Sequence, residues 1–271
     1  MIYQALWNGV KIPVLGLGTF KLEPNETYKI VVEALRMGYR HIDTAAYYGN
    51  ETEVGQAIRD SGIPREEIFV TTKLWKDQVG YDAALVAFNQ SLERLGLDYI
   101  DLYLLHWPIP ESRQSWRALE DIYESGRVKA IGVSNFDNTQ MAALIKGMKV
   151  LPMVNQIERH PLRVREDVRK FDMDLEMVME GWRPIVRGDL ENDPQLMALA
   201  FKYNKTVAQV ILRWHIQTDF VVFPKTSNVE RLLENISIFD FELTEDEIHL
   251  ISAMDQEKAS LEPQVSVNPK L

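Results

Sequence analysis

Short apolar runs alternate with amphipathic segments along most of this chain. Within residues 26–38, apolar side chains recur at helical spacing and Gly38 closes the segment, a common way for a helix to end. Residues 99–107, in contrast, form a nearly continuous apolar run, which is typical of a strand buried on both faces. The pattern therefore predicts alternating strands and helices.

Eight strand candidates can be counted, and each is followed by at least one helical segment. The predicted strands are 14–18, 40–43, 68–75, 99–107, 128–136, 153–158, 175–182 and 220–225. The predicted helices are 26–38, 50–62, 82–96, 115–126, 138–148, 165–173, 194–204, 207–217, 229–239 and 244–254. An alternating series indicates a parallel sheet, and eight repeats over about 250 residues are typical of an α/β protein with a (β/α)₈ TIM barrel.

Further features refine this prediction. Asn8-Gly9 lies between two short apolar pieces and is a two-residue hairpin signal, so we expect a β-hairpin that plugs the N-terminal end of the barrel. The helices beyond residue 225 are extra C-terminal helices. No Gly/Ser-rich or Pro-rich linker divides the chain, which predicts one barrel domain over residues 1–271.

A doubly wound dinucleotide-binding sheet is the rival fold. Its fingerprint requires G-x-G-x-x-G after the first strand. Residues 16–21, GLGTFK, contain the first two glycines, but Lys21 stands where the third should be. The barrel is therefore favoured.

Composition and charge narrow the possible functions. The 271 residues carry a formal net charge of −10, which argues against a general affinity for nucleic acid or anionic membranes. The absence of cysteine excludes disulfides, thiolate nucleophiles and Cys-ligated zinc. No secretory leader pattern and no membrane-length apolar run is present, so a cytoplasmic protein is the expectation.

Polar residues stand where the predicted strands end. In a barrel these ends converge on one face, where active sites form. Lys73 and His106 lie within apolar strands, where an ionisable side chain is costly unless it is paired. The residues at the strand ends and in the following loops are Asp43, Tyr48, Lys73, His106, Ser134, Asn135, Asn155, Gln156, Trp182 and Lys225.

Four of these residues suggest acid catalysis. Tyrosine, with a pKa of about 10, is alone a poor proton donor at neutral pH. A Lys73 cation near Tyr48 would lower the pKa of the hydroxyl group, and Asp43 would hold Lys73 in place. His106 can bind the same substrate oxygen. This set suits carbonyl reduction, for which a nicotinamide cofactor must supply the hydride.

Six motifs, in order, resemble those of the aldo-keto reductases, over nearly the whole chain. They are GYRHIDTAAYYGNE, IFVTTKLW, DLYLLHWP, IGVSNF, VNQIE and VFPKTSNVERLLEN. Within the family, the chain is most similar to the bacterial 2,5-diketo-D-gluconate reductase and glyoxal reductase branch. The resemblance implies a (β/α)₈ barrel that binds NADPH without a Rossmann domain and reduces aldehydes, ketones, small dicarbonyls or keto sugars. The hydride would come from nicotinamide C4 and the proton from Tyr48.

The resemblance also assigns roles to residues. The catalytic tetrad falls on Asp43, Tyr48, Lys73 and His106. Ser134, Asn135 and Gln156 would bind the nicotinamide carboxamide, and Trp182 would stack on the ring. A 2′-phosphate clamp falls on Lys225, Thr226 and Arg231, with Glu234 and Asn235 on the adenine side. The helix that begins near Asn228 would offer free N–H groups to the phosphate. The residues expected to face the substrate are Phe20, Tyr47 and Trp107.

Two arginines depart from the family pattern. Arg183 follows the stacking Trp182 where the family has Ser or Gly, and it would either contact the cofactor pyrophosphate or crowd its path. Arg159 precedes the His-Pro pair where a less charged residue is usual. The tail over 259–271 is short, which predicts a substrate pocket open on that side.

Two other functions stay open. The chain could be an NADPH-binding sensor or regulatory protein with little turnover, or a barrel with isomerase or lyase chemistry. The second leaves the phosphate clamp and the carboxamide set unexplained. His41 lies close to Asp43 but has no third ligand, so no metal site is predicted. The expected partner is a small carbonyl compound, and the expected oligomeric state is a monomer.

Overall fold

Eight parallel strands lie at the centre of the computed structural model, which describes residues 2–257 and 259. They pair in chain order from β3 to β10. The strands are β3 (Leu17–Gly18), β4 (His41–Asp43), β5 (Phe69–Leu74), β6 (Ile100–Leu105), β7 (Val128–Ser134), β8 (Val154–Glu158), β9 (Val178–Trp182) and β10 (Phe220–Val222). Bridges from Leu15 to Val222 and from Gly18 to Lys225 join the first strand to the last and close the barrel.

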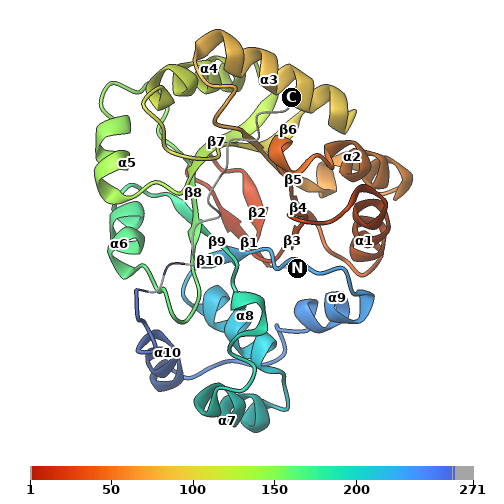
Figure 1. Ribbon diagram of the computed structural model, residues 1–271, viewed down its shortest axis with the longest axis vertical. Coiled ribbons are helices and arrows are strands. Elements are labelled where there is room, and N and C mark those ends of the chain that lie inside the picture. The colour runs from red at the N-terminus through yellow and green to blue at the C-terminus, as the bar shows by residue number, and fades with distance from the viewer. Residues whose placement is uncertain (1, 258, 260–271) are drawn as a thin grey trace.

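Helices surround this barrel, as Figure 1 shows. Those that follow strands β3 to β8 are α1 (Pro24–Arg36), α2 (Glu51–Asp60), α3 (Tyr81–Leu95), α4 (Ser112–Glu124), α5 (Asn138–Leu144) and α6 (Glu166–Asp174). The C-terminal part adds α7 (Pro194–Tyr203), α8 (Val207–Gln217), α9 (Val229–Ile236) and α10 (Glu245–Ser252). The fold is the predicted (β/α)₈ barrel with extra C-terminal helices.

The N-terminal hairpin seals one end of the barrel. Strands β1 (Tyr3–Ala5) and β2 (Lys11–Pro13) pair in antiparallel fashion, and Gly9 takes a positive φ of 87° in the turn between them. Leu6 and Ile12 pack with apolar residues near the amino ends of the barrel strands, among them Leu102, Ala130, Met153, Val154, Val178 and Val221. The polar strand ends are therefore left at the opposite mouth.

Side chains alternate strictly between the barrel interior and the surrounding helices. On β6, Leu102 and Leu104 join the interior cluster, whereas Tyr103 and Leu105 belong to the core between sheet and helices. Each strand thus contributes every second residue to the interior. Toward the carboxyl ends, these interior positions carry the polar residues Asp43, Lys73, Ser134, Gln156 and Glu180.

Several strands are shorter than the sequence predicts, and two of the differences have a clear local reason. Strand β7 ends at Ser134 because Asn135 adopts a left-handed φ of 67°. Strand β9 begins at Val178 rather than 175, because the Leu175 and Met177 amides bond the Asp172 carbonyl at the end of α6. The predicted pairing of strand and helix is otherwise confirmed.

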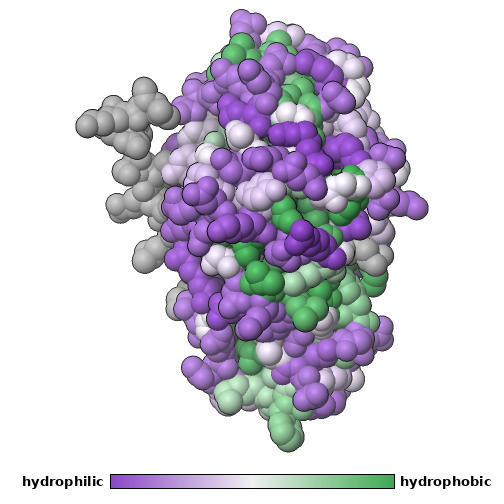
Figure 2. Space-filling model, turned by 90° about the vertical axis from the view of Figure 1, so that its right-hand side faces the viewer, coloured by the Kyte–Doolittle hydropathy of each residue, from purple (hydrophilic) through white to green (hydrophobic). Residues whose placement is uncertain are grey.

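The outer surface is mostly polar. Figure 2 shows the side of α1 and α9, where hydrophilic residues dominate and apolar residues gather in the lower half of the view. Val229 and Leu233 on α9 are among the exposed apolar side chains. None of the helices in the described part of the chain is long and apolar enough to cross a membrane.

Close packing of α2 against the end of α3 leads to a first prediction. A β-carbon at Gly55 would overlap the backbone carbonyl group of Leu95, so Gly55→Ala must push the two helices apart. We expect Gly55→Ala to lower the free energy of unfolding by about 2 kcal/mol, in the range of overpacked cores. Thr52→Ala, on the exposed face of α2, is the matched control. Urea unfolding measures both, and equal stability of the two variants would contradict the prediction.

Candidate active site

A buried ion pair lies at the polar mouth of the barrel. The Lys73 ammonium donates to Asp43 Oδ1 at 2.6 Å and to the Thr44 carbonyl oxygen at 2.9 Å. Lys73 is fully buried and Asp43 nearly so. Burial acts to lower the pKa of Lys73, but Asp43, Tyr48 and Glu180 outweigh it and raise the pKa above its usual value. Lys73 is therefore a fixed cation.

The loop after β4 carries Tyr48 and is held by its own hydrogen bonds. Gly49 takes a left-handed φ of 67° and ends the short turn at 46–48. The buried side chain of Asn50 then accepts from the Thr44 hydroxyl at 2.8 Å and donates to the Thr19 carbonyl at 3.0 Å. The loop is thus tied to β4 and to the segment after β3. This explains why the sequence places Asn directly after Gly49.

Tyr48 meets the ion pair, but its pKa differs from the prediction. Lys73 Nζ lies 3.4 Å from the Tyr48 hydroxyl group, and Lys73 acts to lower the pKa as expected. Burial is the larger effect, however, and raises the pKa of Tyr48 to about 12. The prediction of a lowered pKa is therefore wrong for this protein without bound cofactor, because removal of the hydroxyl from water outweighs the nearby cation. Tyr48 is a protonated donor at neutral pH.

His106 completes the cluster as a neutral imidazole. Its ring centroid lies 5.8 Å from that of Tyr48 in an edge-on arrangement. Burial, and then the charge of Lys73, lower the pKa of His106 well below its usual value. An uncharged ring carries one N–H, which it can donate to an oxygen held beside Tyr48. The four residues of the predicted tetrad are therefore brought together.

Aromatic rings surround the cluster. The Phe20 ring lies 4.9 Å from that of Tyr48, Tyr47 stacks on Trp75 at 3.8 Å, and Trp107 lies 6.4 Å from His106. Trp75 also meets His106 edge-on at 5.0 Å and was not among the predicted site residues. The sequence could have indicated Trp75, because it stands two residues after Lys73 and side chains two residues apart on a strand share a face. Phe20 and Tyr47 are partly exposed.

The predicted carboxamide set forms a connected network. The Ser134 hydroxyl donates to the Gln156 carbonyl at 2.8 Å, and Asn135 Nδ2 donates to the His106 carbonyl at 3.0 Å. Trp182 Nε1 donates to Asn135 Oδ1 at 2.9 Å, which fixes the indole ring at the mouth. Strands β7, β8 and β9 therefore bring these side chains to one side of the tetrad.

Gln156 links this network to the ion pair and to Glu180, which sequence reasoning missed. Gln156 Nε2 donates to Asp43 Oδ2 at 2.9 Å and to Glu180 Oε2 at 2.8 Å. Burial, and then Asp43, raise the pKa of Glu180 to about 8. Glu180, like Lys73 and His106, is an ionisable residue within an apolar strand, so the reasoning that singled out those two residues applies equally to it.

The predicted phosphate clamp lies at the start of α9. Lys225 and Arg231 are exposed, and neither forms an ion pair with the residues that the structure describes. The expectation of free helix N–H groups is wrong for two of them, because Asn228 Oδ1 accepts from the Glu230 and Arg231 amides. Thr226 is also engaged, since its hydroxyl oxygen accepts from the Asn228 amide at 3.0 Å. The free groups here are the two cations.

The two residues assigned to the adenine side differ in their surroundings. Glu234 is partly exposed, and its Oε1 accepts from the Thr206 hydroxyl at 2.7 Å, at the start of α8. Asn235 is buried in α9. Both belong to the helix that carries Arg231, on the β10 side of the mouth.

The two unusual arginines lie in different surroundings. Arg183, with a left-handed φ of 58°, places its guanidinium 3.8 Å from Glu158 Oε1 beside Trp182. Arg159 is buried on the helix side of β8. Its guanidinium stacks on Trp214 and Phe220 at 3.8 and 3.9 Å from the ring centroids. Arg159 therefore packs behind the sheet and does not reach the mouth.

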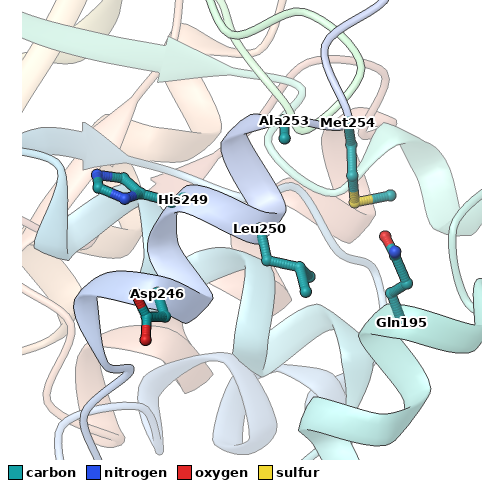
Figure 3. Close-up of a pocket in the computed structure, with 6 residues that line it drawn as sticks. All are labelled: Gln195, Asp246, His249, Leu250, Ala253 and Met254. Carbon is teal, nitrogen blue, oxygen red and sulfur yellow. The ribbon is translucent and has the colours of Figure 1, made fainter.

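A separate surface pocket lies between α7 and α10. In Figure 3, Gln195, Leu250 and Met254 face one another, whereas Asp246 and His249 point away from them. None of the predicted site residues lines this pocket. Among the described residues, no group of three His, Asp or Glu side chains could hold a metal ion. Residues 260–271 lie outside the described part, so the expectation of an open pocket beside the tail stays a prediction.

Comparisons with known proteins agree with this geometry. The model of the Aldo/keto reductase family matches residues 14–256. Glyoxal reductase of Bacillus subtilis is 46% identical over 255 residues, which cover 93% of this chain and 92% of the relative.

Solved structures extend the similarity to the fold. An aldo/keto reductase from Brucella melitensis is 46% identical with a TM-score of 0.91, and the match covers 94% of this chain and 99% of that one. An aldo-keto reductase of Bombyx mori, solved in complex with NADP, is 36% identical with a TM-score of 0.90. That match covers 95% of this chain and 94% of the other.

Removal of Asp43 tests the ion pair. Asp43→Ala leaves Lys73 buried without its carboxylate, and we expect the free energy of unfolding to fall by about 3–5 kcal/mol. Glu33→Ala is the matched control, because the Glu33–Arg36 pair is solvent-exposed and contributes about 1 kcal/mol or less. Chemical unfolding followed by circular dichroism measures both variants. If both variants lose the same free energy of unfolding, the buried pair contributes no more to stability than the exposed pair does.

Proposed function

We propose that this chain, which belongs to the aldo/keto reductase family, is an NADPH-dependent oxidoreductase that reduces small aldehydes and ketones to alcohols. The observation that carries the proposal is the position of Tyr48. Its hydroxyl group lies 3.4 Å from the buried Lys73 ammonium, and its ring contacts His106. A proton donor, a cation and a neutral imidazole thus converge where a carbonyl oxygen can be held.

The side chains supply acid catalysis and orientation. Tyr48 donates a proton to the carbonyl oxygen as negative charge develops there, and Lys73 stabilises the resulting tyrosinate. Asp43 keeps Lys73 in place throughout. The His106 N–H binds the same oxygen and orients the carbonyl group. The rings of Phe20 and Trp75 exclude water from one side, which strengthens these interactions.

NADPH is the cofactor that the residues fit. When bound, it supplies the hydride that protein side chains lack. The main-chain carbonyl of Gln156 accepts from Ser134, but its side-chain oxygen, Oε1, forms no hydrogen bond among the described residues, so Oε1 is an acceptor ready for the carboxamide. The indole ring of Trp182 offers a flat apolar surface beside it. Lys225 and Arg231 are cations without carboxylate partners, suited to a 2′-phosphate group. The NADP complex of the Bombyx mori relative supports this assignment.

Small dicarbonyl compounds and keto sugars are the proposed substrates. The similarity to a bacterial glyoxal reductase supports this class. The partly exposed rings of Phe20, Tyr47 and Trp107 form a wide rim that suits compact substrates with a polar second group.

Removal of the Tyr48 hydroxyl group tests the proposed role of Tyr48 as the proton donor. We expect Tyr48→Phe to lower the rate of carbonyl-dependent NADPH oxidation by about 10²–10⁴-fold, because the proton donor is removed, and to keep NADPH binding. The assay follows NADPH absorbance with methylglyoxal, a diketo sugar acid and nitrobenzaldehyde. Tyr28→Phe, which removes a surface hydroxyl bonded to Asp60, is the control.

The same assay separates the alternatives. Normal turnover by Tyr48→Phe would refute the role of Tyr48. If the wild-type protein quenches its tryptophan fluorescence on NADPH addition but oxidises none with any carbonyl, the protein is an NADPH sensor rather than a reductase.

A second prediction concerns the choice between NADPH and NADH. Arg231→Ala removes one cation from the proposed phosphate clamp. We expect the dissociation constant of NADPH to rise roughly tenfold or more, as for loss of a charged hydrogen bond, and that of NADH to stay unchanged. Arg36→Ala, on the outer face of α1, controls for the change in net charge. Fluorescence titration measures both cofactors, and parallel weakening of both would place Arg231 outside the phosphate site.

A further inference from the structure

Glu180 is a buried carboxyl group that the proposed reaction does not use. It lies in the middle of β9, is completely inaccessible to solvent and faces the barrel interior. Its Oε2 accepts from Gln156 Nε2 at 2.8 Å, whereas its Oε1 forms no hydrogen bond with the described residues. A carboxyl group in such a place needs a reason, because burial of its charged form is costly.

The order of the strands shows what Glu180 supports. In the closed ring from β3 to β10, β8 lies opposite β4, and β9 lies opposite β5. Gln156 on β8 therefore reaches across the barrel to Asp43 on β4 at 2.9 Å. Glu180 lies beside Gln156 on the neighbouring strand β9, and it accepts the second hydrogen bond of the Gln156 amide nitrogen. The Asp43–Lys73 pair is thus held from both sides of the interior.

The charges around Glu180 favour its neutral form at neutral pH. Asp43 and His41 face it from β4 and Lys73 from β5, while its neighbours on β8 and β10 are Gln156 and Val221. Lys73 is the only cation in this group, since burial lowers the pKa of His41 to about 3. One cation is shared by two carboxyl groups. With a pKa of about 8, Glu180 is mostly the neutral acid at pH 7.

The same bonds fix the orientation of the Gln156 amide. An amide nitrogen has two N–H groups, and those of Gln156 are directed at Asp43 and at Glu180. A flipped amide would place its oxygen against the Asp43 carboxylate. Asp43 and Glu180 therefore act together, since both accept from the nitrogen, and the side-chain oxygen of Gln156 faces the proposed cofactor.

We propose that Glu180 is a positioning residue for the proposed reductase: through Gln156 it aligns both the Asp43–Lys73 pair and the cofactor carboxamide, and its ionisation weakens proton donation by Tyr48. This inference rests on the proposed function. The sign of the effect follows from charge. Ionised Glu180 adds a negative charge that stabilises the Lys73 cation but opposes formation of the tyrosinate. Reduction should therefore slow as the pH rises through about 8.

Two variants separate the hydrogen bond from the charge. Glu180→Gln keeps an acceptor for Gln156 but cannot ionise, whereas Glu180→Leu removes the acceptor. Glu176→Gln, an exposed residue just before β9, is the matched control. For each protein, kcat and KM are measured against pH, and the dissociation constant of NADPH is measured by tryptophan fluorescence.

We expect Glu180→Gln to bind NADPH as the wild type does and to lose the decline in kcat near pH 8. Glu180→Leu should weaken NADPH binding about three- to tenfold, as for loss of one hydrogen bond that orients the amide. The control, Glu176→Gln, should match the wild type in NADPH affinity and in the pH dependence of kcat. A purely structural role would lower stability without moving the pH profile, and the Gln variant decides the matter even if the Leu variant does not fold.

Infrared spectroscopy of the protein without cofactor provides a readout that does not depend on turnover. The difference between the wild-type and Glu180→Gln spectra should contain the carbonyl stretching band of a buried carboxylic acid, and this band should disappear as the pH rises through about 8. If wild-type protein oxidises NADPH but both Glu180 variants keep its pH profile and NADPH affinity, the inference is overturned and the proposed function stands. If no carbonyl is reduced, the proposed function fails. The infrared band and the NADPH titration then still decide whether Glu180 is a neutral acid that orients Gln156.

Discussion

The contact between Lys73 and Asp43 is the interaction on which the rest of the site depends. Two charges removed from water are costly, and the 2.6 Å contact is favourable only if the remaining hydrogen-bonding groups are also satisfied. The barrel meets this demand with the Thr44 carbonyl on the Lys73 side and the Gln156 amide on the Asp43 side. The pair therefore requires specific partners from several strands, and it fixes their relative positions in return.

This constraint explains why the barrel interior is divided into two parts. The amino ends of the strands enclose an apolar cluster that Leu6 and Ile12 of the hairpin seal against water. The carboxyl ends enclose the polar network. Because the hairpin closes the far end, water reaches the network only from the mouth. The buried cation beside Tyr48 consequently acts through a medium of low dielectric constant, where its effect on a developing negative charge is large.

The sequence predicted the fold, and it predicted which polar side chains meet at one mouth, because both follow from the order and ends of the strands. Lys73 and His106 were recognised as ionisable residues in apolar strands, and the structure brings them to one mouth. The pKa of Tyr48 could not be predicted, because the sequence indicates a nearby cation but not the extent of burial, which is the larger effect. The capping of α9 by Asn228 was likewise hidden, since an N-cap residue and a phosphate ligand compete for the same N–H groups.

The alternation of side chains between the two faces of a strand predicts which residues face the barrel interior, and the predictions made from the sequence did not use it. Side chains two residues apart share a face, so Glu180 must point the same way as Trp182, and its place in the interior could have been deduced. Arg159 stands three residues after Gln156 and must therefore point outward, toward Trp214 and Phe220. The unusual charge at 159 is thus a packing feature of the layer between sheet and helices, whereas Glu180 is linked to the Asp43–Lys73 pair through a single residue, Gln156. In a closed barrel, the face on which a charge lies decides its relation to the chemistry more than its rarity in the sequence does.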